Sequence, residues 1–239
     1  AFAHGAPTRC FGALFEPFKG RRVPRIPNGS FRFLDRVPVV DGPKGVVEVG
    51  RTLTGECEVS TDAWFLLPDG MAPHAILMEM GMQPCGFLSA YMGSTRHHPD
   101  TDFYFRNLDG EAVLLRPVDL RGRTVTSRVT LRASTAVGNA IVQTFGFTLA
   151  CGGEDFYTGE ATFGYFTRAT LDARAGLDGG EAITPWLRRS SGMDGSTPPL
   201  SYEQMPARLS FLRDVRVVAG GGTALAVGES GTILERPHR

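Results

Sequence analysis

The chain has 239 residues, enough for one large domain or for roughly one and a half small ones. Hydrophobic residues make up 42% of it and charged residues 21%, so the chain can bury a core and is not of the disordered class. Its 25 basic residues balance its 25 acidic residues, which gives no reason to expect nucleic acid or an anionic membrane surface as a partner.

The sequence also lacks segments typical of membrane or secreted proteins and cysteine motifs typical of metal or disulfide sites. No apolar run reaches membrane-spanning length, and the N-terminus lacks the charged-then-apolar pattern of a signal peptide. The four cysteines form no CxxC pair, and their spacing suits neither a zinc site nor a disulfide framework. We therefore expect a cytoplasmic protein with no membrane contact and no metal, whose thiols are reduced and at least half-buried.

The first part of the chain predicts an arm followed by a hairpin. Residues 1–30 carry four prolines among aromatic residues and arginines, which favours an extended arm lying on a domain rather than a helix or strand. Residues 31–40 and 46–53 are typical of strands and are separated by the turn signal Asp41-Gly42. These two segments are predicted to pair.

A buried helix is predicted over residues 75–92, which are apolar almost all round. Pro73 suits the start of such a helix, and Gly93 suits its end. Pro84 lies inside and is expected to kink or split the helix.

Four strands are predicted after the helix, over residues 111–116, 123–132, 139–151 and 155–167. In the second of them Val125, Val129 and Leu131 alternate with polar residues, the period of a half-buried strand. The order is two strands, one helix and then a meander of long strands. It predicts an α+β fold in which a long antiparallel sheet wraps round a single central helix.

The C-terminal part predicts a linker and a repeat. Residues 171–206 are rich in Gly, Pro and Ser, as linkers are. Residues 209–228 match residues 31–50 at a constant offset of 178, with eight identities in twenty positions. We expect residues 207–239 to begin a second copy of the first domain, truncated before its helix, and the chain to be a piece of a longer protein.

Glu79 and Gln83 are the only strongly polar side chains between residues 75 and 87, and their spacing places them on one helix face. Burial raises the pKa of a carboxyl and favours the neutral acid, which is the form that donates a proton to a leaving hydroxyl. The alternative is a structural Glu79 that is capped by Gln83 or faces solvent. The residues alone leave both interpretations open.

The histidines carry less information. His74 stands at the predicted helix start, where free backbone N–H groups of the first turn can hold a thioester carbonyl, and its imidazole is interpreted as a packing or capping group. His97 and His98 are interpreted as solvated loop residues, and His4 and His238 lie near the termini.

The region around the helix resembles the active-site stretch of bacterial β-hydroxyacyl-ACP dehydratases of the hot-dog fold. It is still more similar to the dehydratase regions of polyunsaturated-fatty-acid synthases and related polyketide synthases, in the first, histidine-lacking of two fused hot dogs. The residues that carry the resemblance are Trp64, Phe65, Asp69, Pro73, Glu79, Gln83, Gly86 and Phe87.

The resemblance implies a hot-dog domain over residues 31–170 that removes water from a 3-hydroxyacyl thioester. It implies Glu79 as the acid, with Gln83 supporting it, and places the family's proton-abstracting histidine at Phe65, which cannot act as a base. Residues expected beside the substrate are His74, Ala75, Phe65 and Phe87. In this chain His74 replaces the glycine that usually opens the helix.

The implied partners follow from the missing base. The substrate is expected on the phosphopantetheine of an acyl carrier protein, with no cofactor bound to the chain itself. A second hot dog, in the same polypeptide or in a homodimer, would supply the histidine, near position 243 if the offset of 178 holds. The alternative is a non-catalytic hot dog that scaffolds an active neighbour or shapes its acyl tunnel. A thioesterase or acyl-binding hot dog acting alone is disfavoured because no base lies near Glu79 in the sequence.

Overall fold

The computed structural model of the chain describes residues 2–138, 140–173, 223–227 and 233–237. The chain divides into two units, Ala1–Ala175 and Gly176–Arg239, which are described separately. Within the described residues, no helix combines the length and the apolar character needed to cross a bilayer.

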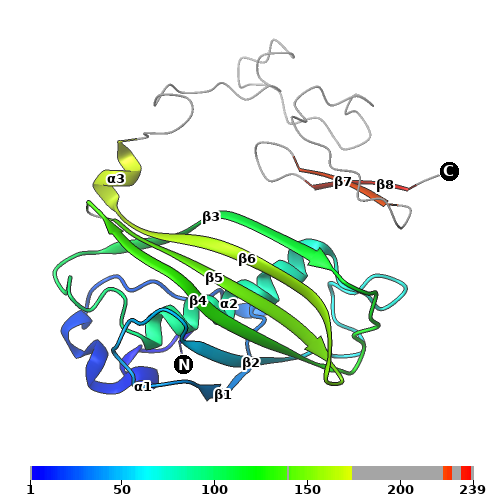
Figure 1. The fold of residues 1–239 in the computed structure, drawn as a ribbon, viewed down its shortest axis with the longest axis horizontal. Helices are drawn as coiled ribbons and strands as arrows, with labels where there is room; N and C mark the ends of the chain where they lie inside the picture. The colour runs from blue at the N-terminus through cyan, green and yellow to red at the C-terminus, as the bar shows by residue number, and fades with distance from the viewer. Residues whose placement is uncertain (1, 139, 174–222, 228–232, 238–239) are drawn as a thin grey trace, which may run out of the picture. The chain divides into compact units, whose positions relative to one another are not determined.

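The first unit is built on a six-stranded sheet in which every neighbouring pair is antiparallel. Its strand order is β1-β2-β4-β5-β6-β3 (Figure 1). The strands are β1 (Arg36–Val40), β2 (Thr52–Glu58), β3 (Phe103–Leu114), β4 (Thr124–Val137), β5 (Ala140–Cys151) and β6 (Glu154–Thr167).

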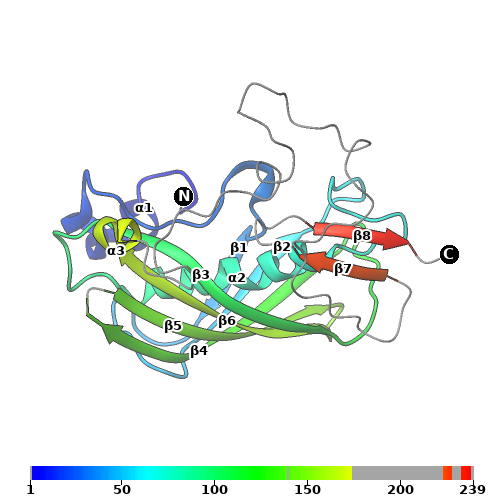
Figure 2. The ribbon, with the colours of Figure 1, turned by 90° about the horizontal axis from the view of Figure 1, so that it is seen from above.

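Helix α2 (His74–Tyr91) lies against one face of this sheet, and the long strands curve around it (Figures 1 and 2). Its fully buried residues Met80, Cys85 and Leu88 share one hydrophobic core with Phe145 and Leu149 of β5. A long antiparallel sheet wrapped round a central helix is the hot-dog arrangement, so the predicted fold class is confirmed.

The boundaries of α2 agree with the sequence signals to within a residue. Pro73 immediately precedes the helix, and Gly93 takes a left-handed φ of 70° just after it. Pro84 does not split the helix, although it can donate no bond to the carbonyl one turn before. Pro84 is buried against Gly55 of β2, so tertiary packing holds the helix together at this point.

The strands are found in the predicted order, with corrections at their ends. The alternation in β4 is confirmed, because Val125, Val129 and Leu131 are all buried. Strands β1 and β2 do pair, but β2 begins at Thr52 rather than at residue 46. Residues 46–49 form a loop because the glycines on either side, Gly45 and Gly50, take left-handed φ angles.

The N-terminal arm is not wholly extended as predicted. It contains α1 (Thr8–Phe11) and the 3-10 helices η1 (Gly12–Phe18) and η2 (Gly29–Phe31). The arm does lie on the domain, as expected. Its aromatic side chains form a second buried cluster, made of Phe2, Phe11, Phe15 and Phe18 with Ile26 and Leu34. The spacing of Phe11, Phe15 and Phe18, at intervals of four and three residues, buries one face of the helical turns.

The second unit contributes one described hairpin, in which β7 (Thr223–Val227) pairs antiparallel with β8 (Ile233–Pro237). Helix α3 (Arg168–Asp172) occupies the first residues of the predicted linker, and residues 174–206 lie outside the described part. At the offset of 178, β8 falls on β2, but β7 falls on the loop at 45–49 rather than on β1. The second hot-dog copy therefore stays a prediction.

The close approach of α2 to the sheet predicts the effect of a methyl group at Gly81. A Cβ there would lie 2.4 Å from Cδ2 of Phe147. We expect Gly81→Ala to lower the free energy of unfolding by about 1–3 kcal/mol through overpacking, although alanine is the better helix former. Gly86→Ala is the matched control, because its Cβ would lie 3.5 Å from the nearest atom. Equal stability of the two variants in urea unfolding would contradict this packing.

Candidate functional site

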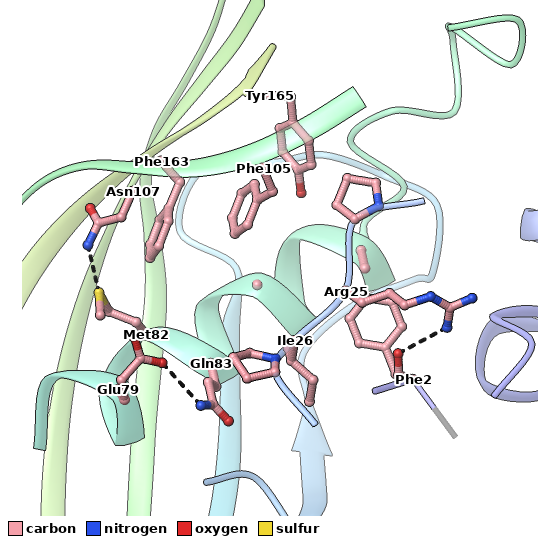
Figure 3. A pocket seen from close by; sticks show the side chains of 14 residues that line it. Phe2, Arg25, Ile26, Glu79, Met82, Gln83, Phe105, Asn107, Phe163 and Tyr165 are labelled. Carbon is pink, nitrogen blue, oxygen red and sulfur yellow. Dashed lines mark hydrogen bonds between the residues drawn. The ribbon is translucent and has the colours of Figure 1, made fainter. Parts of the chain in front are cut away.

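Glu79 and Gln83 lie one turn apart on α2, as predicted, and their side chains meet. Gln83 Nε2 donates a hydrogen bond to Glu79 Oε2 at 3.1 Å (Figure 3). Glu79 is half-buried, whereas Gln83 is only 3% exposed. The helix period alone accounts for this pair.

The Gln83 amide is also bonded to the segment before β1. Its Oε1 accepts from the backbone N–H of Phe33 at 2.7 Å, and its Nε2 donates to the carbonyl of Phe31 at 2.9 Å. These two backbone partners require the amide nitrogen on one side and the oxygen on the other. The amide nitrogen is thereby held toward Glu79, so Gln83 can support that carboxyl only as a donor.

The environment of Glu79 favours its neutral form. Burial raises the pKa of this carboxyl, and the hydrogen bond from Gln83 opposes part of that rise. A protonated Glu79 is a proton donor, whereas an ionised one would be an acceptor only. Glu79 therefore has the chemistry of a carboxylic acid in a partly desolvated environment.

Glu79 borders a pocket with a volume of about 220 Å³ between α2, residues 24–27 of the arm and strands β3 and β6. The stacked rings of Phe105 and Phe163, with centroids 4.9 Å apart, form the wall opposite the helix. In Figure 3, Glu79 and Met82 lie toward one end of this pocket and Phe2 and Arg25 toward the other. An elongated, mainly apolar space thus begins at the carboxyl.

Sequence reasoning missed several residues that shape the pocket. Asn107 of β3 lies near Glu79 and donates from its Nδ2 to the Met82 Sδ at 2.9 Å. Tyr165 of β6 lines the same pocket. Helix positions 82, 86 and 90 were detectable, since they follow Glu79 on one face at helical spacing. The strand residues gave no such signal, because their approach depends on how β3 and β6 pair.

The four residues expected beside the substrate lie elsewhere, and none of them borders this pocket. Phe65 packs edge-on against Phe33, with ring centroids 5.4 Å apart. Phe87 packs against Phe2 and Phe11, with centroids 5.7 and 5.2 Å away. Ala75 is half-buried in the first turn of the helix. The structure therefore brings together Glu79 and Gln83 but not these aromatic residues.

His74 is the first residue of α2, and its Nδ1 lies 3.0 Å from the hydroxyl of Tyr157. Burial lowers the pKa of this imidazole, which keeps it neutral near pH 7. His74 is otherwise exposed, so its interpretation as a packing or capping group stays a prediction. The ring still stands at the helix start, where the free backbone N–H groups lie.

Within the described part of the chain, the remaining histidines and the cysteines form no metal-ligand cluster. His97 and His98 are exposed, as predicted, and His4 is exposed in the arm. His238 lies outside the described residues. Among the residues that the structure describes, no group of three or more possible metal ligands comes together. Cys57, Cys85 and Cys151 are buried and free, whereas Cys10 is exposed, contrary to the prediction that the thiols would be at least half-buried.

The fold and the site together define a hot-dog domain with a partly desolvated carboxyl at an apolar pocket. No protein-family model matches the chain. It is 30% identical, over an alignment of 247 residues, to one subunit of a polyunsaturated fatty acid synthase from Thraustochytrium sp.. The match covers 98% of this chain but 16% of that protein, so the chain spans about a sixth of its relative. The resemblance to polyunsaturated-fatty-acid synthases, which the helix motif indicated, is thus confirmed.

Solved structures with similar folds include two from bacteria. The dehydratase heterocomplex ApeI:P from Xenorhabdus doucetiae is 19% identical with a TM-score of 0.45, over 60% of this chain and 89% of that chain. The E. coli PaaI protein from the phenylacetic acid degradation operon is 10% identical with a TM-score of 0.38, over 51% and 80%. These likenesses concern the fold alone. The fold assignment itself comes from the strand order and the position of the helix.

The bonds of the Gln83 amide predict a cost for removing it. Gln83→Met keeps a side chain of similar length but leaves the buried N–H of Phe33 without its acceptor. We expect the free energy of unfolding to fall by about 1–3 kcal/mol in urea titration. The control is Asn107→Ala, which removes an exposed amide and should change stability by less than about 0.5 kcal/mol. A stable Gln83→Met variant would show that the amide does not hold the segment before β1.

The raised pKa of Glu79 predicts a pH dependence of stability. Between the unfolded and the folded pKa, Glu79 stays protonated in the folded state but is ionised in the unfolded state. Its contribution to the free energy of unfolding is therefore complete below the usual glutamate pKa of about 4.3 and is lost as pH rises through the folded pKa. Glu79→Gln lacks the effect. We therefore expect the stability of Glu79→Gln relative to the unaltered protein to increase as pH is raised from 4 to 8. A difference that is constant with pH would contradict the burial of this carboxyl.

Proposed function

We propose that the chain is half of a dehydratase module that removes water from 3-hydroxyacyl thioesters in polyketide or fatty-acid biosynthesis. Glu79 is the acid of this half. The observation that carries the proposal is a half-buried carboxyl, whose pKa is raised by burial, at the side of a mainly apolar pocket. Loss of a β-hydroxyl as water requires such a proton donor.

The substrate is an acyl chain attached to the phosphopantetheine of an acyl carrier protein. The similarity to part of a polyunsaturated fatty acid synthase supports this class of substrate. The mainly apolar walls of the pocket suit a hydrocarbon, and Gln83 and Asn107 are the polar groups near Glu79. Such a combination of many apolar contacts and a few polar groups is common in ligand sites.

The proton on the α-carbon has to be taken by a base from a partner. Among the described residues that border the pocket none is a histidine, and Phe65 stands where the resembling dehydratases have theirs. A second hot dog, in the same polypeptide or in another copy of this chain, would bring a histidine opposite Glu79. The reaction then divides between two hot dogs, one supplying the acid and the other the base.

A non-catalytic role is the second candidate, and one observation favours it. Gln83, expected to support the acid, also makes two hydrogen bonds to backbone that hold the segment before β1. In that case Glu79 and Gln83 stabilise the fold, and the chain scaffolds an active neighbour or shapes its acyl tunnel. The two candidates differ in whether turnover depends on the Glu79 proton.

Replacement of Glu79 in the full-length natural protein separates them. We expect Glu79→Gln to lower kcat for dehydration of a 3-hydroxyacyl thioester by about 100-fold or more, with little change in KM, because the amide cannot donate an acidic proton. The matched control is Glu160→Gln, at an exposed position of β6 that does not border the pocket. Formation of the 2-enoyl thioester is followed by its ultraviolet absorbance. Unchanged turnover in Glu79→Gln would contradict the role of Glu79 as the acid and would favour the scaffold role.

A further inference from the structure

Helix α2 contains two glycines in its central turns, and only one of them is explained by packing against the sheet. At Gly81 a Cβ would overlap the ring of Phe147, at 2.4 Å. At Gly86 the nearest atoms to a Cβ would be Phe105 Cε1 at 3.5 Å and Ile26 Cγ2 at 3.7 Å, which is ordinary van der Waals contact. A methyl group would fit there, and glycine is a poor helix former. The absence of a side chain at Gly86 therefore needs another reason.

Gly86 lies on the helix face that forms the floor of the pocket. The residues of α2 that border the pocket succeed one another along the helix from Glu79 through Gln83 and Gly86 to Ala90. At 1.5 Å per residue, Gly86 lies about 10 Å and Ala90 about 16 Å beyond Glu79 along the axis. The two positions farthest from the carboxyl thus carry the smallest side chains of the helix residues that border the pocket.

The wall over these small residues is held in place. Tyr165 borders the pocket, and its hydroxyl is hydrogen-bonded to Ser89, which is fully buried. Ser89 in turn donates to Oε1 of Gln143, also fully buried. A ring anchored through such a buried network cannot easily move aside for a larger group on the helix. A larger side chain at Gly86 or Ala90 would therefore reduce the part of the pocket that these two residues border.

We propose that Gly86 and Ala90 set the length of the acyl chain that the pocket accepts, with the chain running along α2 away from Glu79. This inference rests on the proposed function, because it takes the acyl thioester to react beside Glu79. An extended hydrocarbon advances about 1.3 Å per carbon, since its C–C bonds of about 1.5 Å form a zigzag. Gly86 then meets the chain about eight carbons from the reacting end, and Ala90 about thirteen.

The test measures binding rather than turnover, so it does not depend on the identity of the catalytic acid. The 239-residue chain is titrated with non-hydrolysable 3-hydroxyacyl pantetheine amides of four, ten and sixteen carbons. For Gly86→Leu we expect the affinity for the four-carbon probe to stay within about twofold and that for the two longer probes to fall about 10- to 100-fold, as buried methylenes are lost. For Ala90→Leu we expect a loss of that size only with the sixteen-carbon probe.

Two controls accompany these variants. Met78→Leu introduces leucine on the same helix outside the pocket and should bind all three probes as the unaltered chain does. Thermal melting checks folding, and Ala90→Leu tests the same inference independently should Gly86→Leu unfold.

An equal loss for all three probes would overturn the inference, because the pocket would then hold the pantetheine arm. No loss for any probe would also overturn it. If Glu79→Gln retains full turnover while the length pattern holds, the proposed acid is wrong but the control of chain length stands.

Discussion

The amide of Gln83 is the group on which the rest of the site depends. It holds the backbone before β1 through Phe31 and Phe33, and it presents its nitrogen to Glu79. The two bonds to backbone cannot form with the amide reversed, because a carbonyl oxygen cannot donate. The fold thus fixes the orientation of the Gln83 amide. That orientation places an N–H donor beside Glu79 at this side of the pocket.

Burial then shifts the protonation equilibrium of Glu79 toward the neutral acid. Desolvation disfavours the carboxylate, and the single hydrogen bond from Gln83 recovers only part of the lost solvation. A cation beside the carboxyl would have reversed this balance, but Arg25, the cation that borders the pocket, is committed to the carbonyls of Phe2 and Gly5. Residues 24–27 of the arm therefore border the pocket, while the guanidinium of Arg25 bonds to backbone carbonyls rather than to Glu79.

The sequence was sufficient for the features that depend on local periodicity. An apolar helix with Glu79 and Gln83 one turn apart, and the alternation in β4, follow from residue spacing alone. The far wall of the pocket does not, because Phe105 and Tyr165 come together through the pairing of β3 with β6. The helical turns of the arm were also missed. Proline there favoured an extended chain, yet burying Phe11 and Phe15 against the domain prevails over that local preference.

The aromatic residue at position 65 bears on how the work of a two-part site is divided. Phe65 packs against Phe33, whose N–H bonds to Gln83, so the position at which the resembling dehydratases have a histidine here packs against the segment that Gln83 holds. A histidine in the same place would add a titratable group to that apolar contact, and burial would disfavour its charged form. In the proposed division of the reaction, placing base and acid on different hot dogs would allow each environment to suit one group, and here the partly buried surroundings of Glu79 favour the protonated form.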